Sequence, residues 1–473
     1  MQVGKDATVS GGCGTGNHSE PKSTCERQNG DNSAHESPFA LDGASLACSK
    51  RSAQVRRSRA RIAPAMHVLR SLALCAALAG IAAIPVLAQP VSNTPVVTLG
   101  DDVFLGKAWR DLHGRCIGIV TNRSGVTSSG ESFVDAVRKN SQICVKALFA
   151  PEHGLRGDRP AGSYVASYTD PQTGLPVYSL YGATRHPSAS MLAGVDVLVF
   201  DIQDVGARPY TYVSTMAYVM ESAKEYGKEI WVLDRPNPIG GTQVEGPVLD
   251  PKFKSFVGLY PIPERHGMTV GELAKLFNDR FGIGATLRVI PMSGWRRDMV
   301  WAETGLPWTA TSPNIPYART TLVYLSTGLI DEAGINNGVG SDKPFERAGV
   351  FGMDQNGYAA AMNARKIPGV HFTATSWMPD AGFWKGKTLT GVEIDVNDPH
   401  VFPSVRTAVE LMCAARGLGP YVKIHAERTM DIDWGTDSIR KEVLAGVSPD
   451  TILAAWQPQV AAFNAIRAKY LLY

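Results

Sequence analysis

Between residue 114 and about residue 291, short apolar runs rich in β-branched residues alternate with stretches of helical periodicity. The apolar runs predict five buried strands, at Cys116–Thr121, Ile143–Ala150, Val195–Ile202, Glu229–Leu233 and Thr286–Pro291. The stretches between them predict helices at Ser132–Lys139, Tyr212–Tyr226 and Val270–Phe281. Continuous apolar strands separated by helices favour a mostly parallel sheet with helices on both faces. We therefore expect an α/β fold with a Rossmann-like sheet.

Around residues 292–320 the pattern becomes irregular and rich in Trp and Pro, which is typical of a crossing between domains. The chain has 473 residues, more than the roughly 250–300 at which a single core stops growing, so two domains are expected. We assign the Rossmann-like domain to residues 89–305 and a smaller C-terminal α/β domain to residues 306–473. In the second domain the pattern predicts strands at Gly391–Val396 and Val422–Ala426 and helices near Ser404–Arg416 and Pro458–Tyr470.

The first 88 residues lack the pattern of a folded domain. Residues 1–65 carry no periodicity and little apolar mass, and we interpret them as disordered or as a mis-called extension. A positive flank then precedes an apolar run from Leu72 to Leu87, which ends in a small-residue cleavage pattern before Gln89. These features predict a signal peptide at residues 66–88. We therefore expect an exported protein, periplasmic or secreted, with no stable membrane insertion after cleavage.

Charge and cysteine content narrow the classes of function. The net charge is +3, and its basic excess lies in the first 88 residues, so the folded part offers no basic face for nucleic acid. Beyond residue 88 only Cys116, Cys144 and Cys413 remain, without the spacing of a metal site, and we expect neither metal nor cofactor. We favour Cys116 and Cys144 as small apolar strand residues over the alternative of a disulfide between neighbouring strands.

Polar residues lie at or just after the carboxyl ends of four predicted strands. These are Asn122 after the first strand, Glu152 and His153 after the second, Asp201 and Asp204 around the end of the third, and Asp234, Arg235 and Asn237 after the fourth. In a parallel sheet, ligands bind beyond the carboxyl ends of the strands, so these residues predict an active-site crevice. The first exit reads TNRSG rather than GxGxxG, which argues against a dinucleotide site.

Two exits carry residue types suited to sugar chemistry. In the turn PEHG, Glu152 stands beside His153, and a glutamate can serve as a general acid where an apolar wall raises its pKa. The alternative is a strand-end glutamate that caps a helix. The loop at residues 201–212 holds two acids, Arg208 and two tyrosines; aromatic rings suit a sugar ring, and arginine suits a carboxylate. The alternative there is a salt-bridged loop leading into a helix.

Two further blocks are less specific. Residues 234–241 (DRPNPIGG) predict a rigid turn after a strand. Residues 263–269 (PERHGMT) place His266 just before a helix, where a lone histidine is more often a structural cap than a catalyst.

In this order and spacing, the four blocks resemble the exo-β-N-acetylmuramidase family of glycoside hydrolases (family 171, long catalogued as a domain of unknown function). The resemblance runs from about Gly118 to the C-terminus, on the motifs PEHG-L-RG, DIQDVG-RPYTY, DRPNP-GG and RHGMT-GELA. It implies a Rossmann-like catalytic domain, a smaller α/β domain, and removal of N-acetylmuramic acid from the non-reducing ends of peptidoglycan fragments. It also implies that Glu152 is the catalytic glutamate, with His153 adjacent, and that the ligands are muropeptides or disaccharides.

We therefore expect catalytic roles for Glu152, His153 and Asp201. The expected substrate-binding residues are Asn122, Asp204, Arg208, Tyr210, Tyr212, Asp234, Arg235, Asn237, Glu264, Arg265, His266 and Asn314. N-acetylmuramic acid carries a lactyl carboxylate, for which Arg208 or Arg235 is the candidate partner. Glycoside hydrolysis also needs a second carboxylate or help from the 2-acetamido group, and the candidate carboxylates are Asp201, Asp204, Asp234 and Glu264.

One block departs from the family pattern. Where members carry a glutamate and an arginine before PFE, this chain has Asn337 and Val339. The departure motivates an alternative function, a non-catalytic paralogue that binds muropeptides. A third class, amidase or esterase, has little support, because the chain beyond residue 88 lacks GxSxG, a convincing SxxK and HExxH. A metal site built from His153, His266 and Asp201 has no ligand signature.

Overall fold

The computed structural model describes residues 97–157, 159–160 and 162–473. The predicted extension at residues 1–65 and the predicted signal peptide at residues 66–88 lie outside the described residues.

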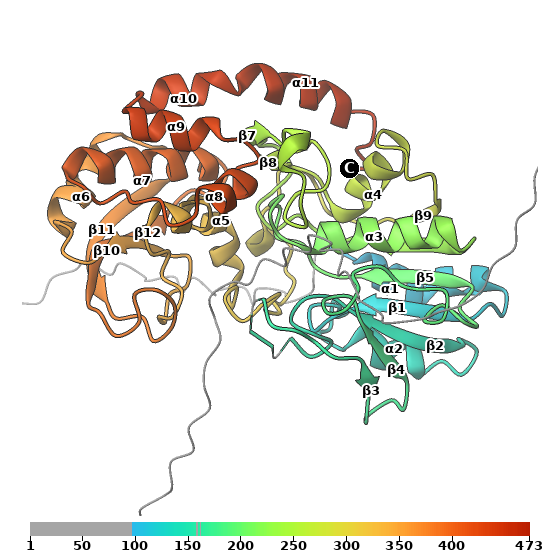
Figure 1. The fold of residues 1–473 in the computed structure, drawn as a ribbon. Coiled ribbons are helices and arrows are strands. Elements are labelled where there is room, and N and C mark those ends of the chain that lie inside the picture. Colours follow the sequence, from blue (N-terminus) through green and yellow to red (C-terminus); the bar gives the residue numbers. More distant parts are fainter. Residues whose placement is uncertain (1–96, 158, 161) are drawn as a thin grey trace, which may run out of the picture. The chain divides into compact units, whose positions relative to one another are not determined.

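The first half of the described chain forms a seven-stranded sheet in the order β3-β4-β2-β1-β5-β6-β9 (Figure 1). Its strands are β1 (Ile117–Thr121), β2 (Val145–Ala150), β3 (Tyr168–Thr169), β4 (Pro176–Ser179), β5 (Val197–Asp201), β6 (Glu229–Leu233) and β9 (Thr286–Ile290). All pairs are parallel except that of β3 with β4. Numbered along the chain, the parallel strands read 3-2-1-4-5-6, the Rossmann order, which reverses between β1 and β5. The five predicted strands and the Rossmann-like sheet are confirmed.

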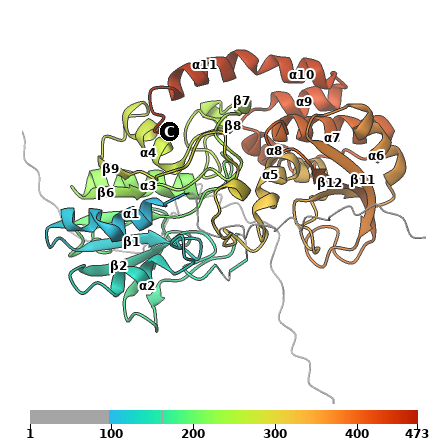
Figure 2. The same cartoon turned by 180° about the vertical axis from the view of Figure 1, so that it is seen from behind.

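Helices cover both faces of this sheet (Figures 1 and 2). They are α1 (Gly100–Gly106), η1 (Ala108–Leu112), α2 (Phe133–Arg138), α3 (Tyr212–Glu225) and α4 (Val270–Asp279). Successive strand residues point to opposite faces. Val199 of β5 therefore packs in the apolar cluster that contains Phe104 of α1 and Phe133 of α2, whereas Phe200 packs with Met216 of α3. Burial on both faces explains why these strands are continuous apolar runs.

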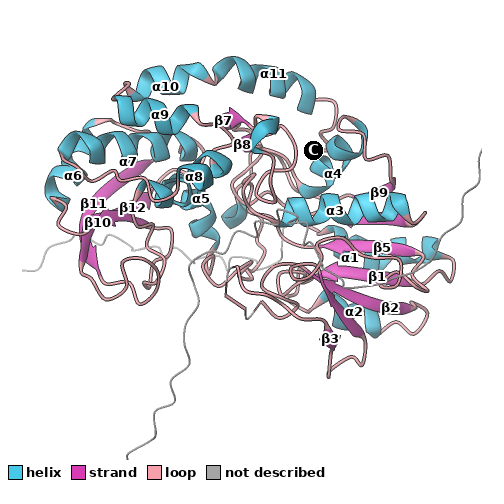
Figure 3. Cartoon of the chain, viewed as in Figure 1, coloured by secondary structure: helices cyan, strands magenta, loops and turns pink. Residues whose placement is uncertain are grey.

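The C-terminal part contains a three-stranded antiparallel sheet in the order β10-β12-β11 (Figure 3). The remaining elements are β7 (Glu245–Val248), η2 (Pro251–Phe253), β8 (Pro263–Arg265), η3 (Trp301–Glu303), α5 (Ala318–Thr327), η4 (Gly328–Ala333), β10 (Arg347–Val350), α6 (Gln355–Ala364), β11 (Val370–Trp377), β12 (Leu389–Val396), α7 (Ser404–Leu418), α8 (Glu427–Asp433), α9 (Ser438–Ala445), α10 (Pro449–Ala455) and α11 (Gln457–Arg467). The smaller C-terminal α/β part is thus confirmed. None of the helices that the described residues form is long and apolar enough to cross a membrane.

The predicted strand at Val422–Ala426 is wrong. This segment is extended, but its backbone N–H groups donate to the 3₁₀ helix η4 and the residues that end it, from Lys423 to the carbonyl of Ala333 at 2.9 Å and from His425 to that of Glu332 at 2.8 Å. A short helix offers only these few acceptors, so no strand ladder forms.

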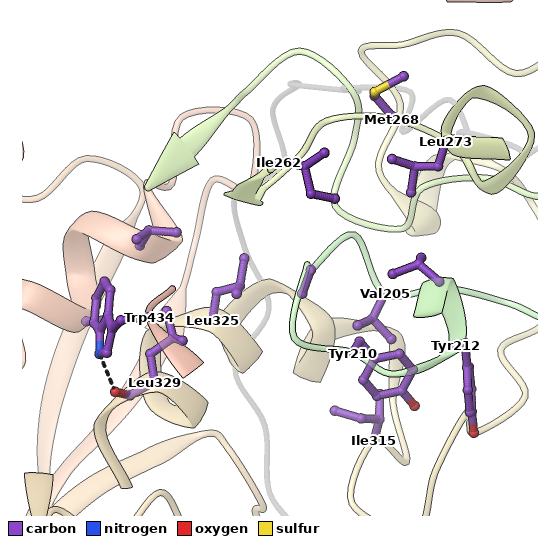
Figure 4. Packing of buried hydrophobic residues seen from close by; sticks show 14 of the residues in the cluster. Val205, Tyr210, Tyr212, Ile262, Met268, Leu273, Ile315, Leu325, Leu329 and Trp434 are labelled. Atoms are coloured by element: carbon purple, nitrogen blue, oxygen red, sulfur yellow. Dashed lines mark hydrogen bonds between the residues drawn. The ribbon is translucent and has the colours of Figure 1, made fainter. Parts of the chain in front are cut away.

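One apolar core continues from the α3 and α4 face of the sheet into the C-terminal helices. Figure 4 shows part of it, with labelled residues Val205, Tyr210, Tyr212, Ile262, Met268, Leu273, Ile315, Leu325, Leu329 and Trp434. Trp434, which directly follows α8, anchors the far end, because its indole N–H donates to the carbonyl of Leu329 at 2.8 Å. The loops at the carboxyl edge of the large sheet are therefore held against a packed C-terminal half.

Cys116 and Cys144 form a disulfide, with their Cα atoms 4.5 Å apart. The prediction that they are unpaired apolar residues is therefore wrong. Because β1 and β2 pair in parallel with Ile117 opposite Val145, the residues that precede both strands lie side by side. The sequence predicted both strands but not the register that brings the two thiols together.

Replacing both cysteines by serine is expected to lower the free energy of unfolding by roughly 3 kcal/mol, because the disulfide closes a loop with a sequence separation of 28. Urea denaturation with and without reductant checks this. Reductant should bring the wild-type protein to the stability of the double variant and should leave that variant unchanged. Equal stability of oxidised wild type and variant would contradict the prediction.

Candidate active site

The motifs predicted from the sequence lie at the carboxyl edge of the parallel sheet, around the point between β1 and β5 where the strand order reverses. Glu152 follows β2 by two residues and is half-buried, so a ligand from solution can reach it. Its Oε1 accepts from the backbone N–H of Gly162 at 2.9 Å, and its Oε2 accepts from the hydroxyl of Thr211 at 2.8 Å. The carboxylate is thus held by two segments that are far apart in the sequence.

Tyr181 lies beside Glu152, because the ends of β4 and β2 are paired and the backbone N–H of Leu180 donates to the carbonyl of Ala150 at 2.8 Å. Burial, followed by the charge of Glu152, raises the pKa of Tyr181 to about 12, so the phenol beside this carboxylate stays protonated. Sequence analysis missed Tyr181, Thr211 and Gly162 as site residues. Tyr181 lies two residues beyond β4, a parallel strand of only four residues that the hydrophobic pattern did not predict.

His153 stabilises the turn beside Glu152. Its ring is buried, its Nδ1 lies 2.8 Å from the carbonyl oxygen of Arg159, and its backbone has a positive φ of 68°. A carbonyl only accepts, so Nδ1 carries the proton of this bond. The bond closes the turn three residues before Gly162, whose N–H contacts Glu152. His153 therefore shapes the loop that holds Glu152, and its direct catalytic role stays a prediction.

Asp201 and Arg235 belong to a buried ion cluster. The guanidinium of Arg235 donates to both oxygens of Asp201, at 2.7 and 2.9 Å, and to Asp101 at 2.7 Å. All three side chains are almost fully buried, and burial raises the pKa of Asp101 and of Asp201 while Arg235 lowers both. Sequence analysis missed Asp101, which comes from the first turn of α1. The Nε and Nη2 of Arg235 donate to Asp201, Asp101 and the carbonyl of Val126, so most of this buried guanidinium is used within the protein rather than presented to a lactyl carboxylate.

Arg208 and Glu264 form a second buried ion pair. The guanidinium of Arg208 also donates to the backbone carbonyl of Asp433 at 3.0 Å. The backbone N–H of Arg208 donates to the backbone carbonyl of Glu264 at 2.8 Å. Burial raises the pKa of Glu264 to about 7, and Arg208 acts in the opposite direction. This arginine therefore already faces a carboxylate of the protein.

Asp204 and His266 lie together behind the same edge. One oxygen of Asp204 accepts from the backbone N–H of Gly206 at 2.7 Å and lies 3.4 Å from Nε2 of His266. Nδ1 of His266 accepts from the backbone N–H of Met268 at 3.2 Å, so the ring proton is on Nε2 and points toward Asp204. His266 therefore bonds to the backbone just before α4, which agrees with a structural capping role for this histidine.

Three other predicted residues make most of their hydrogen bonds within the protein. Asp234 accepts from Thr269, Gly271, Tyr473 and the backbone N–H of Arg235, and burial raises its pKa to about 6. Asn237 donates to the carbonyl of Met268 at 3.0 Å. Arg265 donates to Gln243, Glu245 and the carbonyls of Ile239 and Phe402. These residues support the loops of the site.

The remaining predicted residues occupy the exits of β1 and β5 and the turn before α5. The hydroxyls of Tyr210 and Tyr212 both donate to Thr311, at 2.7 Å to its hydroxyl and 2.6 Å to its carbonyl respectively. Asn122 accepts from the backbone N–H of Ser124 at 2.9 Å, and Asn314 is half-buried in its turn. Together they line the carboxyl edge.

Buried polar atoms without a protein hydrogen-bond partner gather at this edge. Among the described residues they include Asn122 Nδ2, Gln203 Oε1, Asp204 Oδ1, Arg208 Nε and Nη1, Glu264 Oε2 and His266 Nε2. Buried polar groups nearly always bond to protein, water or ligand, so this concentration marks a polar binding region. Among the four candidate second carboxylates, Asp204 and Glu264 keep an unbonded oxygen, whereas both oxygens of Asp201 and of Asp234 are bonded.

The block around Asn337 and Val339, which departs from the family pattern, is linked to this region by aromatic rings. The carbonyl of Asn337 accepts from the backbone N–H of Phe345 at 2.7 Å. The ring of Phe345 lies 4.9 Å from that of Tyr324, which lies 5.6 Å from that of Tyr210. The loop that contains Asn337 and Val339 is therefore linked through Phe345 and Tyr324 to Tyr210 of the second motif.

A Rossmann-order sheet whose carboxyl edge holds a half-buried glutamate, with a smaller α/β part after it, is the arrangement expected from the resemblance. Comparison with protein families agrees. Residues 117–319 match the N-terminal model of the exo-β-N-acetylmuramidase NamZ, and residues 322–473 match the C-terminal model. The chain therefore belongs to the exo-β-N-acetylmuramidase family of glycosidases.

One curated protein and two solved structures are also similar to this chain. The chain is 42% identical over 406 residues to the peptidoglycan β-N-acetylmuramidase NamZ of Bacillus subtilis (strain 168), covering 86% of this chain and 98% of that protein. A crystal structure of a DUF1343 family protein from Bacteroides fragilis NCTC 9343 superposes with a TM-score of 0.76 at 34% identity, over 80% of this chain and 100% of that one. A second DUF1343 family protein of that organism gives 0.63 at 28% identity, over 80% and 99%.

Proposed function

We propose that this protein removes N-acetylmuramic acid from the non-reducing ends of peptidoglycan fragments, with muropeptides or disaccharides as substrates. The observation that carries the proposal is the half-buried carboxylate of Glu152, held by Gly162 and Thr211 at the sheet edge where ligands of this fold bind. The extended identity to a peptidoglycan β-N-acetylmuramidase supports the same substrate class.

In this proposal Glu152 protonates the glycosidic oxygen as the bond to the sugar C1 breaks. The backbone N–H of Gly162 can only donate, so Oε1 stays an acceptor in both protonation states. The hydroxyl of Thr211 can rotate to accept instead, which makes Oε2 the oxygen that carries the proton. Proton transfer leaves Oε2 anionic, and Thr211 then turns back to donate to it.

The positive charge that develops at C1 needs a second group, either a carboxylate or the substrate's own 2-acetamido group. Asp204 and Glu264 are the protein candidates, because each keeps an unbonded oxygen. Water then attacks C1, and Glu152, now ionised, takes up its proton. The net reaction adds one water across the glycosidic bond and restores the enzyme.

We also propose that the protein is exported to the periplasm or secreted and acts in the recycling of cell-wall material. Two features support export. Residues 66–88 have the sequence pattern of a signal peptide, and Cys116 and Cys144 form a disulfide, which is typical of proteins in oxidising compartments.

The test is release of N-acetylmuramic acid by the purified protein from a chromogenic β-N-acetylmuramide, and from muropeptides with product masses measured. We expect turnover of the muramide and little turnover of the matching β-N-acetylglucosaminide. Calorimetric binding of the muramide without any product would overturn the proposal and favour the non-catalytic alternative.

A further inference from the structure

The lactyl carboxylate of N-acetylmuramic acid distinguishes this sugar from N-acetylglucosamine, so a selective site needs an accessible cation. Neither arginine predicted for this task meets the requirement. Arg235 is buried and bonded to Asp201 and Asp101. Arg208 is buried against Glu264, so a ligand carboxylate would have to enter a place that already holds an acid.

We infer that Arg185 binds the lactyl carboxylate and thereby selects muramyl over glucosaminyl substrates. The inference rests on the function proposed above and adds to it the residue that recognises the substrate.

Arg185 lies one aromatic ring away from Glu152. Its guanidinium carbon is 5.6 Å from the ring centre of Tyr181, which lies beside Glu152 where the paired strands β4 and β2 end. The same carbon lies 4.0 Å from the ring centre of Phe256. Contact with ring faces orients a guanidinium while leaving its N–H groups free for a carboxylate.

The platform under Arg185 is rigid. Phe256 is buried and stacks on Tyr218, with ring centres 5.9 Å apart and planes 11° from parallel, and it also contacts Tyr181 at 5.8 Å. Arg185 itself is exposed, and no carboxylate of the described residues lies within ion-pair distance of its guanidinium. By contrast Arg156, on the turn that follows Glu152, is paired with Asp170.

The separation fits the chemistry of the sugar. The lactyl ether is attached at C3 and the scissile bond at C1 of one pyranose ring, with only C2 between them, so the groups that recognise them must lie near each other. Arg185 and Glu152 are both neighbours of Tyr181, Arg185 at its ring and Glu152 across the paired ends of β4 and β2. A single muramyl residue can therefore present its glycosidic oxygen to Glu152 and its carboxylate to Arg185 at the same time, with Tyr181 beside the sugar.

The experiment compares wild type with Arg185→Met on a chromogenic β-N-acetylmuramide and on the same compound with its lactyl carboxylate converted to an amide. Loss of a charge-assisted hydrogen bond is expected to lower kcat/KM on the acid by about 10- to 100-fold, mainly through KM, and to leave the amide substrate unchanged. Arg185→Lys should retain part of the preference for the acid. Arg110→Met is the matched control, because Arg110 is also exposed and lies over a ring, that of Trp109, at 4.9 Å.

Binding gives a readout without turnover. Calorimetry should find free N-acetylmuramic acid bound more weakly by Arg185→Met by a similar factor, and N-acetylglucosamine bound equally by both proteins. If wild type hydrolyses the muramide and Arg185→Met keeps its preference for the acid over the amide, the assignment of Arg185 is overturned and the proposed function stands. If wild type releases no N-acetylmuramic acid, the proposed function fails and the assignment with it.

Discussion

Replacing Glu152 by glutamine is expected to lower kcat for release of N-acetylmuramic acid by about 10³-fold, while KM changes little. Glutamine keeps the shape of the side chain, and its carbonyl can still accept from the N–H of Gly162 at the position of Oε1. Its amide can donate to the hydroxyl of Thr211, so the site stays folded. An amide has no proton to give to a glycosidic oxygen. Initial rates on the chromogenic muramide, with a melting curve for each protein, measure the effect.

Glu303→Gln is the matched control, since Glu303 is an exposed glutamate whose carboxylate lies 3.1 Å from His400 and accepts from the backbone N–H of Val300 at 2.9 Å. That variant should turn over the muramide at the wild-type rate. Undiminished activity in Glu152→Gln would remove Glu152 as the proton donor, and Asp204 and Glu264, which keep unbonded oxygens, would be the next residues to test.

The hydrophobic pattern predicted most of the sheet because both of its faces are buried. Val199 and Phe200 are both apolar although they face opposite sides, and such runs stand out in a sequence. β4 was missed because four residues at the side of the sheet make too short a run to recognise. Because β4 was not predicted, Tyr181, which lies two residues after it, was not recognised as a site residue. The aromatic rings over which Arg185 lies were missed for the same reason.

The motif residues were predicted better as a group than one by one. Asp201 ends a strand, and Asp234 and Glu152 follow strands; a parallel sheet brings such residues to one edge whatever their roles. The role of each motif residue depends on partners that are distant in the sequence. Arg235 bonds to Asp101, Asp234 bonds to Tyr473, and Glu152 bonds to Thr211. Spacing along the chain contains no information on those contacts. A dense polar motif here thus includes both groups that support the fold and groups that keep free atoms for a ligand.

Replacing Arg235 by methionine is expected to lower the free energy of unfolding at pH 7 by about 3–5 kcal/mol, because it leaves Asp101 and Asp201 buried without their cation. Burial already raises the pKa of both carboxyls in the folded protein, and Arg235 is the group that lowers them. Without it, both pKa values rise further above the ordinary 3.8.

The raised pKa values of Asp101 and Asp201 determine how the stability of Arg235→Met changes with pH. A carboxyl whose pKa is raised in the folded state binds its proton more tightly there, so its contribution to stability is fully present below pH 3.8 and is lost as the pH rises through the folded pKa. The deficit of Arg235→Met should therefore be smaller at pH 5 than at pH 7. Urea denaturation at both values measures it, with Arg288→Met as the control, since Arg288 pairs with exposed Asp111 and should cost less than about 1 kcal/mol at either pH. A loss for Arg235→Met no larger than that of the control, and independent of pH, would mean that the cluster does not support the fold, and would return Arg235 to the candidates for binding the substrate carboxylate.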